Sequence, residues 1–181
     1  MAHARAGTPQ QAPPVKYVAA LLLSRGIEAA AVVAGGLEGL AGPVDYRGPE
    51  RPFETTDYYE GEMGPGLRRI FVSFEPLGDP ADLARVKLAA ARLEERFSEG
   101  GRRRVNIDPG YIDYFKLVLA SFKEGPQKIW LGEGVWADPV LLFEDGAWRP
   151  LPWSFPDFRA GTYEEELGSI RHVYRLQRRG G

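Results

Sequence analysis

The stretch that decides the fold is LRRIFVSFEPLGDPADLARVKLAAARLEERFSEGGRRRVNID, residues 67–108. Its first nine residues, 67–75, alternate in polarity and predict a strand with one face in the core. Asp79 and Pro80 predict a helix start, because Asp is a favoured N-cap and Pro a favoured first helical residue. After two glycines, residues 102–108 predict a second strand. The segment should therefore be a helix packed on a sheet.

The preceding residues extend this pattern. A continuous apolar run at Lys16–Ser24 predicts a buried strand. The Ala-rich residues 27–41 favour a helix, which Gly35-Gly36 weakens. Residues 43–48 predict a short extended segment. The resulting order, β-α-β-β-α-β, is the split βαβ or ferredoxin-like arrangement.

The second part of the chain has a different character. We expect a strand at Lys116–Phe122 and a β-meander after it, with Asp145-Gly146 as a hairpin turn. Thr162 and Glu165 have the spacing of a capping box and predict the start of a final helix. The fold class we expect is therefore α+β: a ferredoxin-like βαββαβ first part extended by an antiparallel β-meander and a C-terminal helix.

The domain organisation predicted is simple. Residues 1–14 are rich in Ala, Pro and Gln and should form a disordered tail. No linker-like composition interrupts residues 15–181, which we expect to form a single α+β domain. The tail has no apolar h-region, and the longest apolar run is too short to span a membrane, so a cytoplasmic location is expected.

Composition excludes several kinds of chemistry. The chain has no cysteine and only two histidines, His3 and His172, which excludes disulfides, thiolate nucleophiles and His-rich metal sites. The formal net charge is −2, so no overall positive field attracts nucleic acid, and we expect none as a partner. A Walker A loop is absent. The partial dinucleotide match at Gly132–Ala137 precedes a strand-like run instead of a helix, which argues against a dinucleotide site.

The segment Phe53–Gly64, FETTDYYEGEMG, is the first candidate site. Its carboxylates are hard oxygen ligands of the kind that Mg²⁺, Mn²⁺ or Ca²⁺ prefers, and Asp57 and Glu60 would share one face of a helical turn. The competing interpretation is a solvated acidic loop. Two adjacent tyrosines, Tyr58 and Tyr59, favour a ligand role slightly, because one ring should stay at the surface.

The second candidate is Arg102–Tyr111. Asn106 and Asp108 come at the end of the predicted strand, next to a turn predicted at Asp108-Pro109-Gly110. Asp108 could serve a site or could cap the turn through its own backbone. The three arginines at its start, Arg102–Arg104, are either a solvated charge run or a phosphate clamp.

Two lysines complete the candidate set. Lys116 and Lys123 bracket an apolar run, and each could reach across to the acids or extend to solvent in the ordinary way. In the first case Asp57, Glu60 and Glu62 would face the residues around Asp108 across a cleft.

These stretches together resemble a known family. TDYYEGEMG, RIFVSFEPLGDPADLARVKLAAARLEERFSEGGRRRVNIDPGYI, KLVLASFK and PWSFPDFR, followed by a helix ending IRHVY, are similar to the DUF4416 family of uncharacterised bacterial and archaeal proteins. The resemblance covers about Lys16 to Tyr174 and implies no established activity. Relatives have a His-Arg pair where this chain has Gln127-Lys128, and a Thr-Lys where it has Phe122-Lys123.

The sequence leaves two functional hypotheses. The first is a site for a small anionic ligand, such as a nucleotide or another phosphorylated compound, in which Asp57, Glu60 and Asp108 would hold a divalent cation if one is bound. The second is a non-catalytic structural or partner-binding domain whose charges pair internally. The ligand-binding candidates are Asp57, Tyr58, Tyr59, Glu60, Glu62, Asn106, Asp108, Tyr111, Lys116 and Lys123.

Overall fold

The computed structural model describes residues 10–54 and 59–180. Within them the chain forms a mixed α/β structure with few helices and one large sheet of nine strands, in which all pairs are antiparallel. The main path of the sheet is β2-β4-β1-β5-β6-β8-β7, while β3 pairs with β4 and β9 with β8. The expected disordered tail lies largely outside the described residues, since 1–9 are not among them.

The strands are β1 (Val15–Leu23), β2 (Val44–Arg47), β3 (Arg51–Pro52), β4 (Arg68–Gly78), β5 (Val105–Ile112), β6 (Lys116–Ser121), β7 (Ile129–Gly132), β8 (Val135–Glu144) and β9 (Ala147–Pro150). The α-helices are α1 (Ala29–Ala34), α2 (Glu60–Met63), α3 (Leu83–Arg96), α4 (Pro156–Arg159) and α5 (Glu164–Gly180). Two short 3₁₀ turns, η1 (Leu37–Gly39) and η3 (Pro80–Asp82), follow α1 and precede α3. No helix in the described part of the chain is long and apolar enough to cross a membrane.

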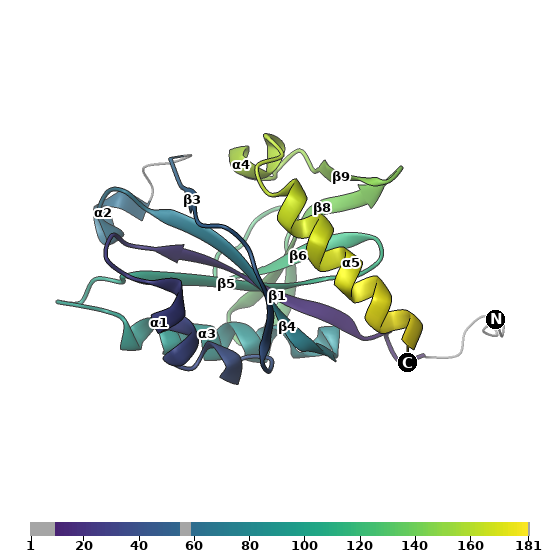
Figure 1. Ribbon diagram of the computed structural model, residues 1–181, viewed down its shortest axis with the longest axis horizontal. Coiled ribbons are helices and arrows are strands. Elements are labelled where there is room, and N and C mark those ends of the chain that lie inside the picture. Colours follow the sequence, from purple (N-terminus) through teal and green to yellow (C-terminus); the bar gives the residue numbers. More distant parts are fainter. Residues whose placement is uncertain (1–9, 55–58, 181) are drawn as a thin grey trace.

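The sheet is covered on both faces (Figure 1). One face carries α1 and α3, whose buried residues join alternate residues of β1, such as Ala19 and Leu21, in one core cluster. The other face carries α4 and α5, which pack on the intervening residues Val18 and Ala20. The continuous apolar run of β1 follows from this position, because a central strand that is covered on both faces has no solvent-exposed side.

A third, smaller core lies at one end of the second face. It consists of Leu22, Phe53, Met63 and Leu67, with Tyr59 packed against it. These contacts attach β3 and α2, and therefore much of the acidic segment, to the sheet. Figure 1 shows α2, β3 and α4 on the same side of the sheet.

Several local predictions are confirmed. The Asp79 carboxylate accepts a hydrogen bond from the backbone N–H of Ala81, and Pro80 occupies the first position of η3, which leads directly into α3. Asp145 and Gly146 have φ angles of 50° and 80° and form the turn between β8 and β9. Both signals are local, so they do not depend on the rest of the fold.

The turn predicted at Asp108-Pro109-Gly110 is wrong, because these residues lie inside β5 and pair with Ala20, Ala19 and Val18 of β1. Strand β6 joins β5 only from Gly110 onward. The backbone N–H and C=O of Ile107 bind side chains of α3, so they point away from β1. Because the direction of the backbone polar groups repeats every second residue along a strand, those of Pro109 also point away from β1. The missing N–H of proline therefore faces a gap in the ladder, where a strand tolerates it.

The expected helix at 27–41 is shorter than predicted. α1 ends at Ala34, and Gly36, with a φ of 120°, separates it from η1. A side chain at Gly35 would also collide with the ring of Phe97, 2.6 Å from the position of its Cβ. The glycines therefore serve a turn and a close contact instead of a continuous helix.

Gly110 marks where β6 begins to pair with β5. A methyl group on Gly110 would lie 2.2 Å from the carbonyl oxygen of Val118 and 2.7 Å from the Leu119 side chain. We predict that Gly110→Ala lowers the free energy of unfolding by about 3 kcal/mol, measured by urea denaturation. The control is Gly168→Ala in α5, where a Cβ has open space, and which should raise stability by about 1 kcal/mol. Unchanged stability of Gly110→Ala would contradict the close approach of β5 and β6.

Candidate functional site

The candidate site is a cleft on the second face of the sheet, between the small core around Phe53 and the helix α4. Strands β1, β4, β5 and β6 contribute its floor, and aromatic rings form much of its wall. The cleft contains about 410 Å³ of empty space, including space that is open to solvent. Its lining residues are Ala20, Phe53, Tyr59, Arg69, Asp108, Leu119, Phe155, Asp157 and Phe158.

The first charged pair of the floor is Arg69 with Asp157. The Arg69 guanidinium donates a hydrogen bond to the Asp157 carboxylate, which also accepts one from the Tyr163 hydroxyl at 2.8 Å. The side chains of Arg69 and Asp157 are 8% and 3% exposed. The guanidinium carbon lies 4.1 Å from the centroid of the Phe53 ring. This ion pair connects β4 to α4. Burial raises the pKa of the Tyr163 hydroxyl.

The second charged group is Asp108. Its carboxylate accepts hydrogen bonds from Lys87 at 3.0 Å and from the Asn106 amide at 2.8 Å. Burial alone would raise its pKa, but the positive charges of Lys87 and Arg69 outweigh burial and lower the pKa below its usual value. The Asp108 side chain is nevertheless 25% exposed. The floor of the cleft thus presents an ionised carboxylate that solvent or a ligand can reach.

A network behind the floor holds Asp108 in place. Arg103 binds both carboxylate oxygens of Glu62 at 2.7 Å, donates to the side-chain oxygen of Asn106 at 2.9 Å and contacts Glu94 at 3.4 Å. The hydrogen bonds from Arg103 lower the pKa of Glu62. Through Arg103, α2 is therefore connected to β5 and to α3.

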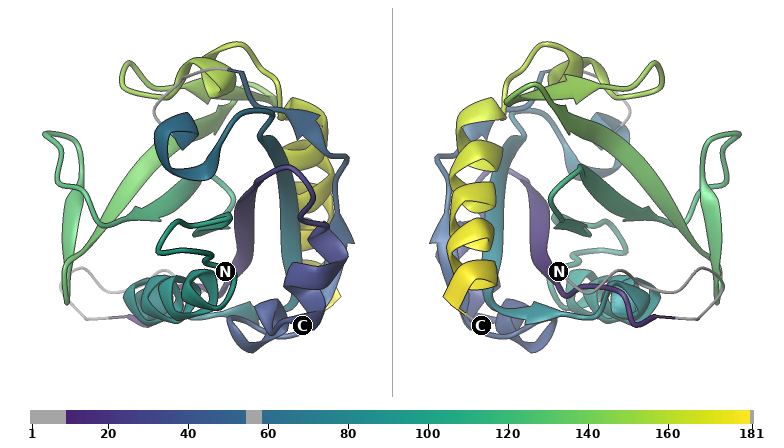
Figure 2. Two further views of the ribbon diagram at one scale, coloured as in Figure 1. Left: turned by 90° about the vertical axis from the view of Figure 1, so that its left-hand side faces the viewer. Right: turned by 90° about the vertical axis from the view of Figure 1, so that its right-hand side faces the viewer.

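The helix α3 also closes the edge of β5. The backbone N–H of Ile107 donates to the Glu94 carboxylate at 2.6 Å, and its carbonyl accepts from Lys87 at 2.8 Å. These bonds replace the strand partner that β5 lacks before Gly110. Figure 2 shows β6 and β8 sloping away from β1 and β4.

The acidic segment is only partly described. Asp57 and Tyr58 lie outside the described residues, so their predicted roles stay predictions. Tyr59 precedes α2, packs edge-on against Phe53 with 6.1 Å between ring centroids, and lines the cleft. Glu60 is exposed on α2. Of the carboxylates in the described part of this segment, Glu62 is the one joined to the Asp108 network.

The remaining candidates lie elsewhere. Tyr111 pairs with Tyr17 in the register of β1 and β5 and belongs to the core cluster on the face of α1 and α3, opposite the cleft. Lys116 forms an ion pair with Asp113 and not with the acids of the cleft. The backbone of Lys123 binds Ser121 and Lys128. Asn106 and Asp108 are thus the sequence-predicted polar residues of β5 that reach the site.

The predicted divalent-cation site stays untested, because it includes Asp57. In residues 10–54 and 59–180 no group of three acidic or histidine side chains is placed to hold a metal ion. Both oxygens of Asp108 already accept hydrogen bonds from Lys87 and Asn106. A cation at Asp108 would have to compete with the ammonium group of Lys87.

Sequence reasoning missed Lys87, Glu94, Arg69 and Asp157 as site residues. For two of them a signal was present: Lys87 and Glu94 are seven residues apart and each follows a buried apolar residue of α3, so both flank its inner face. Arg69 had no such signal, because only the folded structure shows that both faces of β4 are covered. Asp157 had no local signal, since its partners come from β4 and from beyond α4.

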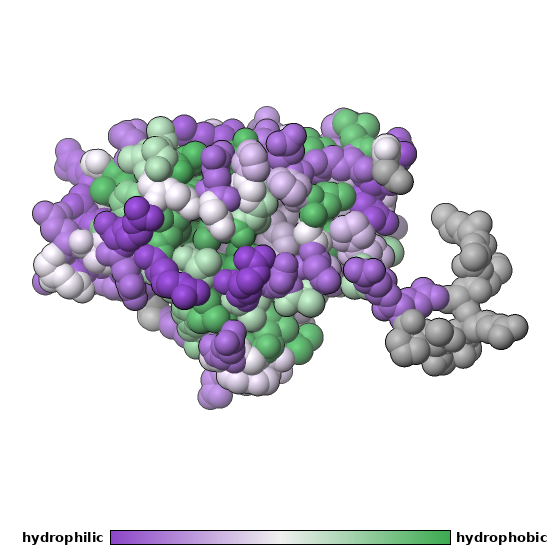
Figure 3. Space-filling view, turned by 90° about the horizontal axis from the view of Figure 1, so that it is seen from below, coloured by the Kyte–Doolittle hydropathy of each residue, from purple (hydrophilic) through white to green (hydrophobic). Residues whose placement is uncertain are grey.

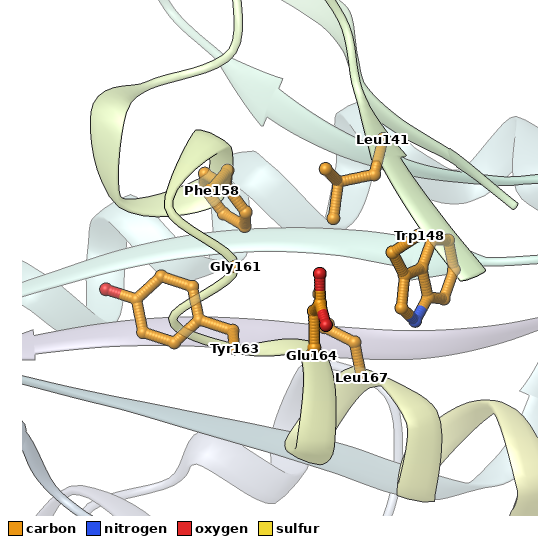
Figure 4. Close-up of a pocket in the computed structure, with 7 residues that line it drawn as sticks. All are labelled: Leu141, Trp148, Phe158, Gly161, Tyr163, Glu164 and Leu167. Carbon is orange, nitrogen blue, oxygen red and sulfur yellow. The ribbon is translucent and has the colours of Figure 1, made fainter.

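A second hollow lies beside α5 and is lined mainly by apolar side chains (Figure 4). The picture shows the Glu164 carboxylate directed toward the space between Phe158 and Trp148. The indole N–H of Trp148 is buried without a partner among the described residues. Among the described residues that line this space, Glu164 is the one with a charged side chain, so the space offers less to a polar ligand than the cleft does.

Comparison with known proteins places the chain in a family. The model of the domain of unknown function DUF4416 matches residues 13–174, so the protein belongs to the DUF4416 family. No curated protein matches it. No solved structure matches it either.

The buried carboxyl of Glu94 should make stability depend on pH. Burial raises the pKa of Glu94, so the folded state binds its proton more tightly than the unfolded state does. The resulting stability is present below the unfolded pKa of about 4.3 and is lost as the pH rises through the folded pKa.

We therefore predict that Glu94→Gln, which can still accept from Ile107, gains stability relative to the native protein as the pH is raised from about 4 to 7. Urea denaturation at each pH provides the measurement. Glu95→Gln removes the same charge from the exposed side of α3 and is the control. A difference between native protein and Glu94→Gln that does not change with pH would contradict the prediction.

Proposed function

We propose that the protein binds a small ligand in the cleft, and that the ligand carries a planar ring and an N–H donor directed at Asp108. The observation that carries this proposal is the exposure of Asp108. Its side chain is 25% exposed, against 8% for Arg69 and 3% for Asp157. Among the charged residues described in the lining, Asp108 is thus the one a ligand can reach, and its lowered pKa keeps it an acceptor.

The walls favour a flat ligand. Phe53 and Phe158 are buried, whereas Phe155 is 54% exposed and leaves much of its ring for contact. Rings that stack or meet edge to face gain about 1 kcal/mol beyond the burial of their surface. Nucleobases and other nitrogen heterocycles combine a ring with N–H donors. These features support the expectation of a nucleotide ligand as far as its base is concerned.

The phosphate of a nucleotide has less support in the cleft. Arg69 already donates to Asp157, and Lys87 donates to Asp108 and to the Ile107 carbonyl. A phosphate there would have to compete for these two cations with the carboxylates that already neutralise them. We therefore assign the cleft to the ring and its donor group.

We also infer that the first part of the chain has the ferredoxin-like arrangement. The antiparallel order β2-β4-β1-β5 and the packing of α1 and α3 in one core cluster support this inference. In that arrangement the face opposite the two helices is open to other segments. Here α2, α4 and α5 lie over it, and the cleft is the part between them.

A second function, that of a structural or partner-binding domain, is favoured by the internal pairing of the charges. Glu62, Arg103, Asn106, Asp108 and Lys87 form one connected set of hydrogen bonds. Such networks rigidify a fold without any ligand.

The ligand proposal is tested by a ligand-observed NMR screen with nucleobases, nucleosides and other nitrogen heterocycles. Phe155→Ala should weaken binding of a hit by about 10-fold or more, as expected for an aromatic contact residue. Phe115→Ala is the matched control, since Phe115 is 69% exposed and does not line the cleft. Asp108→Asn should weaken the same hits. Absence of any binder, or equal weakening by both Phe variants, would refute the proposal.

The structural function is tested by a double-mutant cycle of Glu62→Ala and Arg103→Ala. Because Arg103 binds both carboxylate oxygens of Glu62, we expect a coupling energy of about 1 kcal/mol in chemical denaturation. The exposed pair Arg85–Asp82 is the control and should couple by only a few tenths of a kcal/mol, roughly. Additive effects of the Glu62 and Arg103 variants would mean that the network does not act as a unit.

A further inference from the structure

A second site lies at the end of β1, away from the cleft. There the loop after β1 and the loop before β4 enclose a hollow with about 720 Å³ of empty space, including space open to solvent. Its lining residues are Arg25, Gly26, Pro65, Gly66 and Arg68. In Figure 3 the end of the molecule at the left, where these loops lie, carries many hydrophilic side chains.

We infer that this hollow binds the phosphate group of a small molecule. The first observation is the state of Arg25. Its side chain is exposed and has no hydrogen bond or ion pair with any described residue, whereas its backbone carbonyl is held by Arg104 at 2.9 Å. A guanidinium group on a fixed backbone, at the rim of a hollow, suits an oxyanion.

The second observation is the position of Arg68. Its guanidinium donates to Glu50 at 2.7 Å and to the carbonyls of Ser24 and Ile27, and so shapes the loop that carries Arg25. Its Nε–H is buried without a partner in the described part of the chain. Arg68 therefore positions the loop and adds positive charge beneath it.

The third observation concerns the backbone. Gly26 and Gly66 have φ angles of 83° and 72°, and a Cβ at either position would meet no atom within 4 Å. Their N–H groups form no hydrogen bond with another described residue. Amides in such left-handed turns are common donors to phosphate, because no side chain keeps the anion away.

The local charge balance also favours an anion. Two guanidinium groups, those of Arg25 and Arg68, line the hollow, whereas Glu50, which pairs with Arg68, is not among the lining residues. The excess is positive although the whole chain has a net charge of −2. Several donors from different directions match a tetrahedral oxyanion better than a planar carboxylate.

The hollow is independent of the cleft. Arg68 and Arg69 are neighbours in β4 and pair with Leu23 and Leu22 of β1, so their side chains point to opposite faces of the sheet. Arg69 serves the cleft and Arg68 the hollow. If the cleft does not bind a ring, the proposal of a phosphate site in the hollow is therefore unaffected. Likewise, failure of phosphate binding in the hollow does not affect the proposal for the cleft.

The test is a titration of the ¹⁵N-labelled protein with inorganic phosphate and, in a second arm, with a nucleoside monophosphate. Potassium chloride keeps the ionic strength constant. We expect the amide signals of Gly26 and Gly66 to shift in both arms. Tighter binding of the nucleotide would show that the phosphate belongs to a larger ligand.

Arg25→Gln should weaken phosphate binding by about 10-fold, as expected for the loss of a charged hydrogen bond. Arg92→Gln, which removes an exposed arginine from α3, is the control and should leave binding unchanged. Equal weakening by both variants would mean that the effect comes from the overall charge of the protein and not from Arg25, and would overturn the proposal. No shift of Gly26 or Gly66 in either arm would overturn it as well.

Discussion

The rest of the structure depends on how the edge of β5 is closed at Ile107. Strand β6 begins to pair only at Gly110, so the N–H and C=O of Ile107 have no strand partner. Glu94 and Lys87 of α3 bind these two groups instead. Each would otherwise be a buried polar group without a partner, at a cost of about 1–3 kcal/mol. The helix therefore replaces a strand at the point where the sheet divides.

The same two side chains set the electrostatics of the cleft. Lys87 also binds Asp108 and contributes to lowering its pKa, and Glu94 also contacts Arg103. Arg103 in turn holds Glu62 of α2. A requirement of backbone hydrogen bonding thus leads directly to an ionised carboxylate on the floor of the cleft and to a fixed position for α2.

Much of the secondary structure was predictable because its signals are local. The strand predicted at Lys16–Ser24 and the helix start at Asp79 needed only hydrophobic pattern and capping chemistry. The predicted turn at Asp108-Pro109-Gly110 failed for a reason that no local pattern contains. Pro and Gly favour turns, but here Pro109 faces the gap beside β5 and Gly110 admits the backbone of β6.

Composition and local pattern were enough to establish a large sheet with helices, the absence of cysteine chemistry, and Asn106 and Asp108 as polar residues of interest. The partners of those residues were decided by tertiary structure alone. Glu62 and Arg103 are separated by 41 positions, and Arg69 and Asp157 by 88. Their pairing depends on which strands are neighbours and on which face each side chain lies. Those are properties of the folded sheet, because the alternation of a strand shows that two faces exist but not what will cover each of them.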